Sequence, residues 1–304
     1  MQPSGKLHMG NYLGALRQWV DMSASYDSMF MVADYHALTS LRKPDELRDN
    51  VYDLTADFIA AGIDPAKSII FQQSAVPEHA ELSWIFQCLV SVSFLQQAHA
   101  YKDKTAKGLE ANAGLFAYPM LMAADILLYD TDAVPVGQDQ RQHVEYAREA
   151  AAKFNLAFGE TFKEPKEKVL ESVAVVPGTD GKKMSKSYGN TIPLFGTKDE
   201  IVKAVMGIVT DSGGESPSNV YNIHRLIKDE SALAPVYKAN KGNYRASKEA
   251  LIADIESMVA PMRERRESLT HEDIKKILQD GGERARERAV RKMADVRQKI
   301  GVTL

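Results

Sequence analysis

Helical and strand-like patterns alternate through the first ninety residues, and this alternation constrains the fold more than any other feature of the sequence. Apolar side chains recur with helical spacing between residues 11 and 23, and two further helices are predicted at 44–61 and 77–90. The runs at 29–33 and 68–72 are short and apolar, as buried strands are. This order is typical of an α/β protein with a parallel, doubly wound sheet.

Sheets of this kind bind ligands beyond the carboxyl ends of their strands. Polar residues follow both predicted strands, at 34–36 and at 72–74, so we expect a site there. Two more short strands are predicted at 134–136 and 173–176, with a helix at 139–154 between them.

The second part of the chain has a different pattern. Beyond about residue 188 no strong strand run remains, which predicts a second, smaller, all-helical domain after the α/β domain. Its helices are predicted at 198–209, 220–230, 246–266 and 271–300.

Composition excludes several classes of protein. The chain has 304 residues, of which 44% are hydrophobic and 26% charged, so it is neither disordered, collagen-like nor a coiled coil. Cys88 is the single cysteine, which excludes an intrachain disulfide and a cysteine-rich metal or cluster site. Neither an apolar stretch long enough to span a bilayer nor a signal peptide is present in the sequence. We therefore expect a cytoplasmic enzyme with no membrane partner.

The net charge of −3 does not point to nucleic acid, but the charge is uneven along the chain. Residues 261–304 carry more Lys and Arg than Asp and Glu, which permits an anionic partner. The cations that crowd the last helix fit a solvated face as well as they fit contact with RNA: Arg284, Arg286, Arg288, Arg291 and Lys292.

The string at 4–11, SGKLHMGN, leads directly into the first predicted helix. A helix start presents free N–H groups and the positive end of a dipole, which attract phosphate. Gly10 allows a nucleotide to lie close to the backbone, and His8 can donate to a phosphate oxygen as charge builds there. A simple turn before a helix is the alternative, and this string alone does not separate the two.

The string at 181–187, GKKMSKS, follows a predicted strand and a strong turn cluster. Positive charges on such a loop are suited to closing over a triphosphate and stabilising pyrophosphate as it leaves. A solvated basic loop is the alternative, and the specific order Lys183-Met184-Ser185-Lys186-Ser187 favours the functional interpretation.

These two strings resemble the signature motifs of class I aminoacyl-tRNA synthetases, in the same order and in the same helix and loop contexts. The string at 118–129, YPMLMAADILLY, resembles the amino-acid pocket of the tryptophanyl-tRNA synthetases. The strings DYHA at 34–37, GIDP at 62–65 and VPVGQDQ at 134–140 fit the same family. The resemblance covers nearly the whole chain.

The resemblance implies a Rossmann-type catalytic domain over residues 1–188 and a helical domain that binds the tRNA anticodon over 189–304. The resemblance also allows the last helix to pack back on the catalytic domain. An insertion at about 80–120 would form the interface of a homodimer. The implied reaction is the ATP-dependent activation of L-tryptophan to tryptophanyl-adenylate, followed by transfer to tRNA(Trp), with Mg²⁺ bound to the ATP.

The resemblance also assigns residues to roles. The catalytic set is His8, Lys104, Lys183 and Lys186. The ATP-binding set is Gln2, Pro3, Ser4, Gly10, Asn11, Gly137, Gln138, Asp139, Ala174, Lys183, Met184, Ser185, Lys186 and Ser187. The tryptophan-binding set is His36, Tyr118, Met122, Asp125, Val134 and Gln140. Catalysis needs no covalent nucleophile from the enzyme, because the tryptophan carboxylate attacks the α-phosphorus.

Asp125 is the most informative of these residues. A carboxylate within an apolar helix is costly unless it has partners. Indole offers one donor and no acceptor, so we expect Asp125 to accept from the indole N–H. A cap or an ion pair is the structural alternative.

A protein-bound metal is not expected. Asp139 and His143 share a helix face and could be joined by His36, but such a set is small. We interpret His143 as a hydrogen-bonded structural histidine.

Two departures from the family pattern stand out. Members carry a strand before the Gln-Pro-Ser string, whereas here only Met1 precedes Gln2, so we expect this strand to be missing through a late start or a shortened chain. The string at 94–100 also differs, and no role is carried over to it. The rivals are a tyrosine–tRNA ligase, an RNA-binding paralogue with impaired catalysis, and a small-molecule adenylyltransferase, which would not need the helical part.

Overall fold

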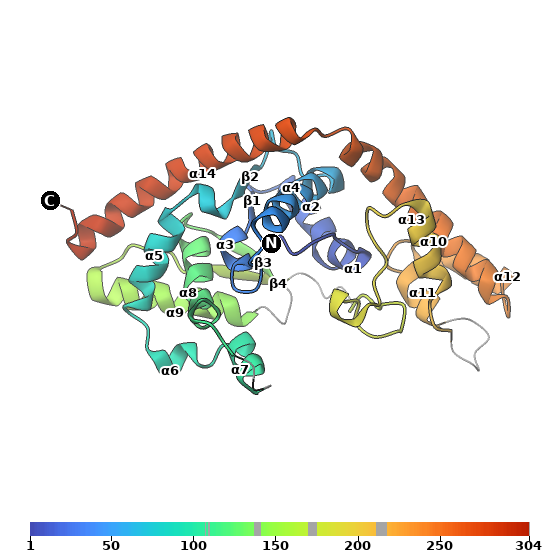
Figure 1. Ribbon diagram of the computed structural model, residues 1–304, viewed down its shortest axis with the longest axis horizontal. Coiled ribbons are helices and arrows are strands. Elements are labelled where there is room, and N and C mark those ends of the chain that lie inside the picture. The colour runs from blue at the N-terminus through green and yellow to red at the C-terminus, as the bar shows by residue number, and fades with distance from the viewer. Residues whose placement is uncertain (107, 109, 137–140, 170–174, 211–217, 304) are drawn as a thin grey trace.

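The centre of the molecule contains two pairs of short parallel strands. In this computed structural model, which describes residues 1–106, 108, 110–136, 141–169, 175–210 and 218–303, β1 (Met29–Val32) pairs with β2 (Ile69–Gln72). β3 (Ala133–Val136) pairs with β4 (Lys166–Val169), also in parallel. Helices surround both pairs, as Figure 1 shows, and the predicted α/β class with a parallel sheet is confirmed.

The helices of the first ninety residues lie where the sequence predicts them. α1 (Met9–Asn11), the π-helical η1 (Tyr12–Leu16) and α2 (Arg17–Ser23) form one continuous segment. Pro44 opens α4 (Pro44–Ala61), and Gly62 ends it at φ 121°, a conformation that favours glycine. The shorter elements are α3 (Asp34–Ala37), η2 (Gln73–Ala75) and α5 (Glu78–Gln87).

The middle of the chain contains α6 (Val92–Leu95), α7 (His99–Ala106), α8 (Ala113–Leu127) and α9 (Arg141–Phe158). The predicted strand at 134–136 is confirmed. β4 was not predicted, because Lys-Glu-Lys-Val is not an apolar run. Of the strand predicted at 173–176, residues 173 and 174 lie outside the described part, and 175–176 are not in a strand.

In the second part of the chain, every regular element that the structure describes is a helix. Its elements are η4 (Lys186–Tyr188), α10 (Lys198–Met206), α11 (Ser218–His224), α12 (Glu230–Ala239), α13 (Tyr244–Glu267) and α14 (His271–Ile300). The single helix predicted at 220–230 is wrong, since α11 ends at His224 and Asp229 precedes a new helix. α12 was missed because it contains Pro235, which normally marks a helix boundary.

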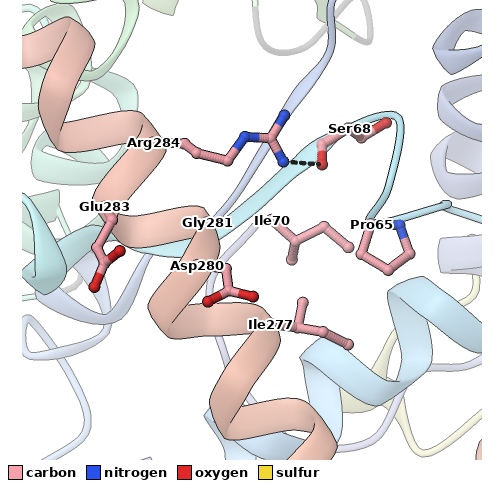
Figure 2. Close-up of a pocket in the computed structure, with 8 residues that line it drawn as sticks. All are labelled: Pro65, Ser68, Ile70, Ile277, Asp280, Gly281, Glu283 and Arg284. Carbon is pink, nitrogen blue, oxygen red and sulfur yellow. Dashed lines mark hydrogen bonds between the residues drawn. The ribbon is translucent and has the colours of Figure 1, made fainter.

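The 30-residue helix α14 returns across the first part of the chain and packs on β2, α4 and α5 (Figure 1). It crosses β2 closely, because a Cβ atom on Gly281 would lie 1.9 Å from the carbonyl oxygen of Ile70. Figure 2 shows the pocket beside this crossing, lined by both elements. None of the predicted site residues lines it.

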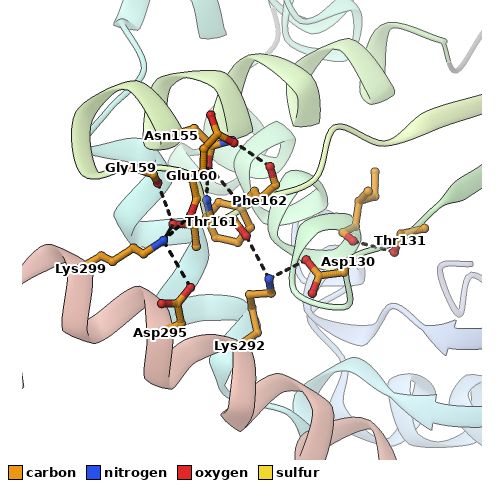
Figure 3. A network of polar contacts seen from close by, with 11 residues as sticks. Asp130, Thr131, Asn155, Gly159, Glu160, Thr161, Phe162, Lys292, Asp295 and Lys299 are labelled. Carbon is orange, nitrogen blue, oxygen red and sulfur yellow. Dashed lines mark hydrogen bonds and ion pairs between the residues drawn. The ribbon is translucent and has the colours of Figure 1, made fainter.

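Basic side chains of α14 bind acids of the first part of the chain. Arg286 and Arg297 pair with Glu78 and Glu81 of α5. Arg288 pairs with Asp27, and Lys292 binds Asp130 and the carbonyl of Thr161, as Figure 3 shows for Lys292. These cations therefore hold the helix in place, whereas Arg291 pairs within α14, with Glu287. Within the described residues, no helix combines the length and the apolar character needed to cross a membrane.

Candidate active site

The N-terminal segment passes the carboxyl end of β1. The amide of Ala33 donates to the carbonyl of Met1 at 2.8 Å, and the Met1 amine donates to the carbonyl of Met31 at 2.7 Å. Pro3 is buried, whereas Gln2 and Ser4 are exposed. The segment therefore lies beside the strand end that leads into α3.

His8 stands at the start of the first helical segment. Its backbone N–H donates to Asn11 Oδ1 at 3.0 Å, which fixes the helix start. The His8 side chain is buried, and its Nδ1 has no hydrogen-bond partner among the described residues. Burial, assisted by the positive charge of Lys186, lowers the pKa of His8 from 6.5 to about 4. The imidazole is therefore neutral at pH 7 and retains an unused ring nitrogen.

The lysine loop is pinned by Asn190, which is 2% exposed. Asn190 Nδ2 donates to Asp180 Oδ1 at 2.6 Å and to the carbonyl of Lys183 at 3.1 Å, while Asn190 Oδ1 accepts from the amide of Ser185 at 2.8 Å. A Cβ atom on Gly178 would lie 2.3 Å from this amide group. These contacts shape the loop so that Met184 points inward and the lysines remain outside.

The lysine loop lies against the helix start. The amide of Gly10 contacts Met184 Sδ at 3.2 Å, and Lys186 Nζ donates to the carbonyls of Ser4 and Gly5, each at 3.0 Å. Burial lowers the pKa of Lys186. The fold thus joins two motifs that are more than 170 residues apart, and an ammonium group faces the helix start where phosphate is favoured.

Asp125 is the centre of a second polar cluster. Its side chain is 8% exposed, and its Oδ1 accepts from Gln73 Nε2 at 2.8 Å and lies 2.7 Å from His79 Nδ1. His36 Nε2 lies 2.7 Å from Oδ2. Burial by itself would raise the pKa of Asp125, but hydrogen bonds from His36 and His79 outweigh it and hold that pKa below its usual range. Asp125 is therefore a carboxylate.

Aromatic and apolar side chains stand beside this cluster. The Tyr118 ring lies 6.4 Å from the His36 ring and 5.6 Å from the His143 ring, between centroids. Met122 and Val134 pack against the same hydrophobic core. Met122 lies one helical turn before Asp125 on α8, so the two share a face.

Not every predicted residue is brought together. Lys104 lies on α7, which Figure 1 places at the lower edge of the molecule, away from α1 and the lysine loop. Lys183 and Ser187 are exposed on the loop. The remaining predicted residues lie outside the described part of the chain: Gly137, Gln138, Asp139, Gln140 and Ala174. Among the residues described, no three His, Cys, Asp or Glu side chains form a metal-binding group.

Two contributors were missed by sequence reasoning, namely His79, which holds the Asp125 carboxylate, and Asn190, which holds the lysine loop. Gln73, which also binds Asp125, lies in the segment 72–74 where a site was expected, but no role was assigned to it. Gln73 follows the carboxyl end of β2, where ligands of α/β proteins bind, so its position did carry a signal. No local pattern indicates His79 or Asn190, because their partners are distant in sequence.

The architecture is that of a Rossmann-type α/β protein, in which the lysine loop lies against the start of the first helical segment. Residues 1–279 match the family described as tRNA synthetases class I (W and Y). The tryptophan–tRNA ligase of Fusobacterium nucleatum is 45% identical, with 99% of this chain and 96% of that protein covered. That of Rhodopirellula baltica is 44% identical, with 99% and 98% covered.

A solved structure agrees with these relatives. Tryptophanyl-tRNA synthetase from Campylobacter jejuni, complexed with ADP and tryptophan, has a TM-score of 0.93 at 43% identity and covers 99% of this chain and 98% of that one. The chain belongs to the class I tRNA synthetases of the tryptophan and tyrosine group. The resemblance noted in the sequence is thereby confirmed.

Proposed function

We propose that the protein is a tryptophan–tRNA ligase, which activates L-tryptophan with ATP and transfers it to tRNA(Trp). The observation that carries the proposal is the buried Asp125 carboxylate, held by His36, Gln73 and His79. Its high-identity relatives bear the same activity in their names, and the Campylobacter jejuni structure contains tryptophan and ADP.

The geometry of Asp125 is suited to recognising the indole N–H. Two carboxylate oxygens offer about four acceptor positions. His36 occupies one on Oδ2 and Gln73 one on Oδ1, while His79 Nδ1 lies 2.7 Å from Oδ1. A free position on Oδ2 matches the single N–H donor of indole. Tyr118, Met122 and Val134 supply apolar surface for the ring. A phenol offers both a donor and an acceptor, so this arrangement favours tryptophan over tyrosine.

The phosphate side of the site is suited to adenylate formation. The tryptophan carboxylate oxygen forms a bond to the α-phosphorus, the bond from that phosphorus to the bridging oxygen breaks, and pyrophosphate leaves. Lys186, Lys183 and the helix start stabilise the leaving group, and neutral His8 can donate to a phosphate oxygen. Mg²⁺ bound to ATP would supply further positive charge. Gln2, Pro3, Ser4 and Asn11 would border the nucleotide.

The proposal extends to assembly and partners. We expect a catalytic domain over 1–188 and a tRNA anticodon-binding domain over 189–304, acting in the cytoplasm. The insertion at about 80–120 would form a homodimer interface. Trp84 is 67% exposed and Val92 is 62% exposed, and an interface would cover such large apolar side chains. The single cysteine, Cys88, is exposed one turn after Trp84.

ATP–pyrophosphate exchange tests the reaction directly. Purified protein is assayed with tryptophan, with tyrosine and with neither, and tryptophan alone should support exchange. Exchange with tyrosine only would replace the proposal by the tyrosine ligase. Absence of exchange with both amino acids would favour the catalytically impaired RNA-binding paralogue. Charging of tRNA(Trp) transcript in the presence of ATP then tests the second step.

A further inference from the structure

The carboxylate that faces the substrate is itself held by a histidine of a different helix. His79, on α5, is fully buried, and its Nδ1 lies 2.7 Å from Asp125 Oδ1. Its ring stacks on Phe71 of β2 at 6.1 Å between centroids, with an interplanar angle of 23°. The imidazole is therefore fixed in orientation as well as in position.

The other nitrogen of this ring has a partner as well. His79 Nε2 lies 2.8 Å from the hydroxyl of Tyr129, four residues after Asp125. Phe71 also packs edge-on against Tyr129, with 5.8 Å between centroids. Asp125, His79 and Tyr129 are thus linked by consecutive polar contacts, and the last two pack against Phe71.

The neighbouring carboxylate decides which nitrogen carries the proton. A neutral imidazole donates from one nitrogen and accepts at the other. A lone pair on Nδ1 would face the negative charge of Asp125 at 2.7 Å, so Nδ1 carries the ring proton and Nε2 is the acceptor. Burial, together with the nearby charges of Asp125 and Glu78, raises the pKa of Tyr129, so the hydroxyl keeps its proton and donates to Nε2. The carboxylate keeps one acceptor position for a substrate N–H.

We propose that Tyr129 and His79 are positioning residues that set the preference of this enzyme for an amino acid with a ring N–H. Neither residue needs to touch the substrate. They act by holding Asp125 Oδ1, so that the remaining acceptor position on Oδ2 keeps its direction. This inference rests on the proposed function and adds two specificity-determining residues to it.

The test compares Tyr129→Phe with the matched control Tyr146→Phe. Tyr146 is a buried tyrosine of the core against which the partly buried Tyr129 packs, but its hydroxyl has no hydrogen-bond partner among the described residues. ATP–pyrophosphate exchange is measured with tryptophan and with the analogue in which sulfur replaces the ring N–H. Loss of one buried hydrogen bond corresponds to a rise of about fivefold to twentyfold in KM for tryptophan. KM for ATP and kinetics with the analogue should change little.

The ratio between the two substrates separates the outcomes. A smaller preference for the N–H substrate in Tyr129→Phe, with Tyr146→Phe unchanged, supports the inference. An equal loss of activity with both substrates in Tyr129→Phe, or no loss, overturns the inference. Either result leaves the wild-type exchange with tryptophan, and so the proposed function, unaffected. Failure of the wild type to use tryptophan would instead overturn the proposed function.

A second variant keeps the test decisive if Tyr129→Phe folds poorly. In His79→Asn the amide Nδ2 can still donate to Asp125, whereas His79→Ala removes the donor. The preference for the N–H substrate should therefore be lost in His79→Ala and largely kept in His79→Asn. An equal preference in these two variants would contradict the inference. Melting temperatures of all variants report any general loss of packing.

Discussion

At the scale of single residues, the proposed recognition of tryptophan depends on Asp125. Asp125→Ala removes a charged acceptor, so KM for tryptophan should rise about 10-fold to 100-fold, with KM for ATP nearly unchanged. Exchange kinetics measure both constants. The matched control is Asp254→Ala, which also removes a carboxylate 2.7 Å from a buried histidine, His224, but in the helical part. Equal losses for tryptophan and ATP would show that Asp125 is structural.

His8 makes a prediction about pH. Its folded-state pKa of about 4 lies below the ordinary 6.5, so between these values the unfolded chain binds a proton that the folded protein does not. Stability contributed by His8 is complete above pH 6.5 and is lost as the pH falls toward 4. The urea unfolding midpoint should therefore drop less from pH 7 to pH 5 in His8→Asn than in the wild type.

The control for this measurement is His99→Asn, which changes an exposed histidine. Its midpoints should follow those of the wild type at both pH values. If the urea midpoints of His8→Asn and the wild type fall equally from pH 7 to pH 5, His8 is not the source of this pH dependence.

At the scale of elements, the crossing of α14 over β2 depends on Gly281. Alanine normally stabilises a helix relative to glycine, by about 1 kcal/mol. Here its Cβ would meet the Ile70 carbonyl at 1.9 Å, so Gly281→Ala should lower the free energy of unfolding by about 1–3 kcal/mol or more, as overpacking does. Urea denaturation measures the change.

Gly14 provides the comparison, because an added Cβ there would contact only Val176 Cγ2, at 4.0 Å. Gly14→Ala should be neutral or mildly stabilising. Equal behaviour of the two variants would mean that α14 can move away from β2 without cost.

Element prediction from sequence succeeded where the pattern is local. α4 lies at the predicted positions because Pro44 and Gly62 mark its ends. β4 was missed because charged residues are uncommon in strands, and α12 was missed because proline is uncommon inside helices. In both elements, tertiary contacts override these local preferences. The role of the α14 cations was open for the same reason, because their acidic partners lie about 160 to 260 residues away.

At the scale of the whole molecule, we expect a homodimer. Trp84→Glu places a charge on the exposed apolar surface of the insertion and should convert a dimer into a 33.7 kDa monomer, with reduced exchange activity. Sedimentation velocity at micromolar concentration distinguishes the two. Leu156→Glu, at a side chain 90% exposed but outside the insertion, should remain dimeric. A wild type that sediments as a monomer would contradict the proposed assembly.

The sequence by itself predicted the helices and strands of the first ninety residues, the family resemblance, and Asp125 and the two motifs as site candidates. These follow from local periodicity and short strings, which need no knowledge of distant contacts. Only the tertiary structure decided that Lys186 faces Ser4 and Gly5, that α14 returns over β2, and that His36, Gln73 and His79 hold Asp125. The physical reason is that a buried carboxylate needs donors from whichever segments folding brings to it, and its neighbours in sequence do not specify those segments.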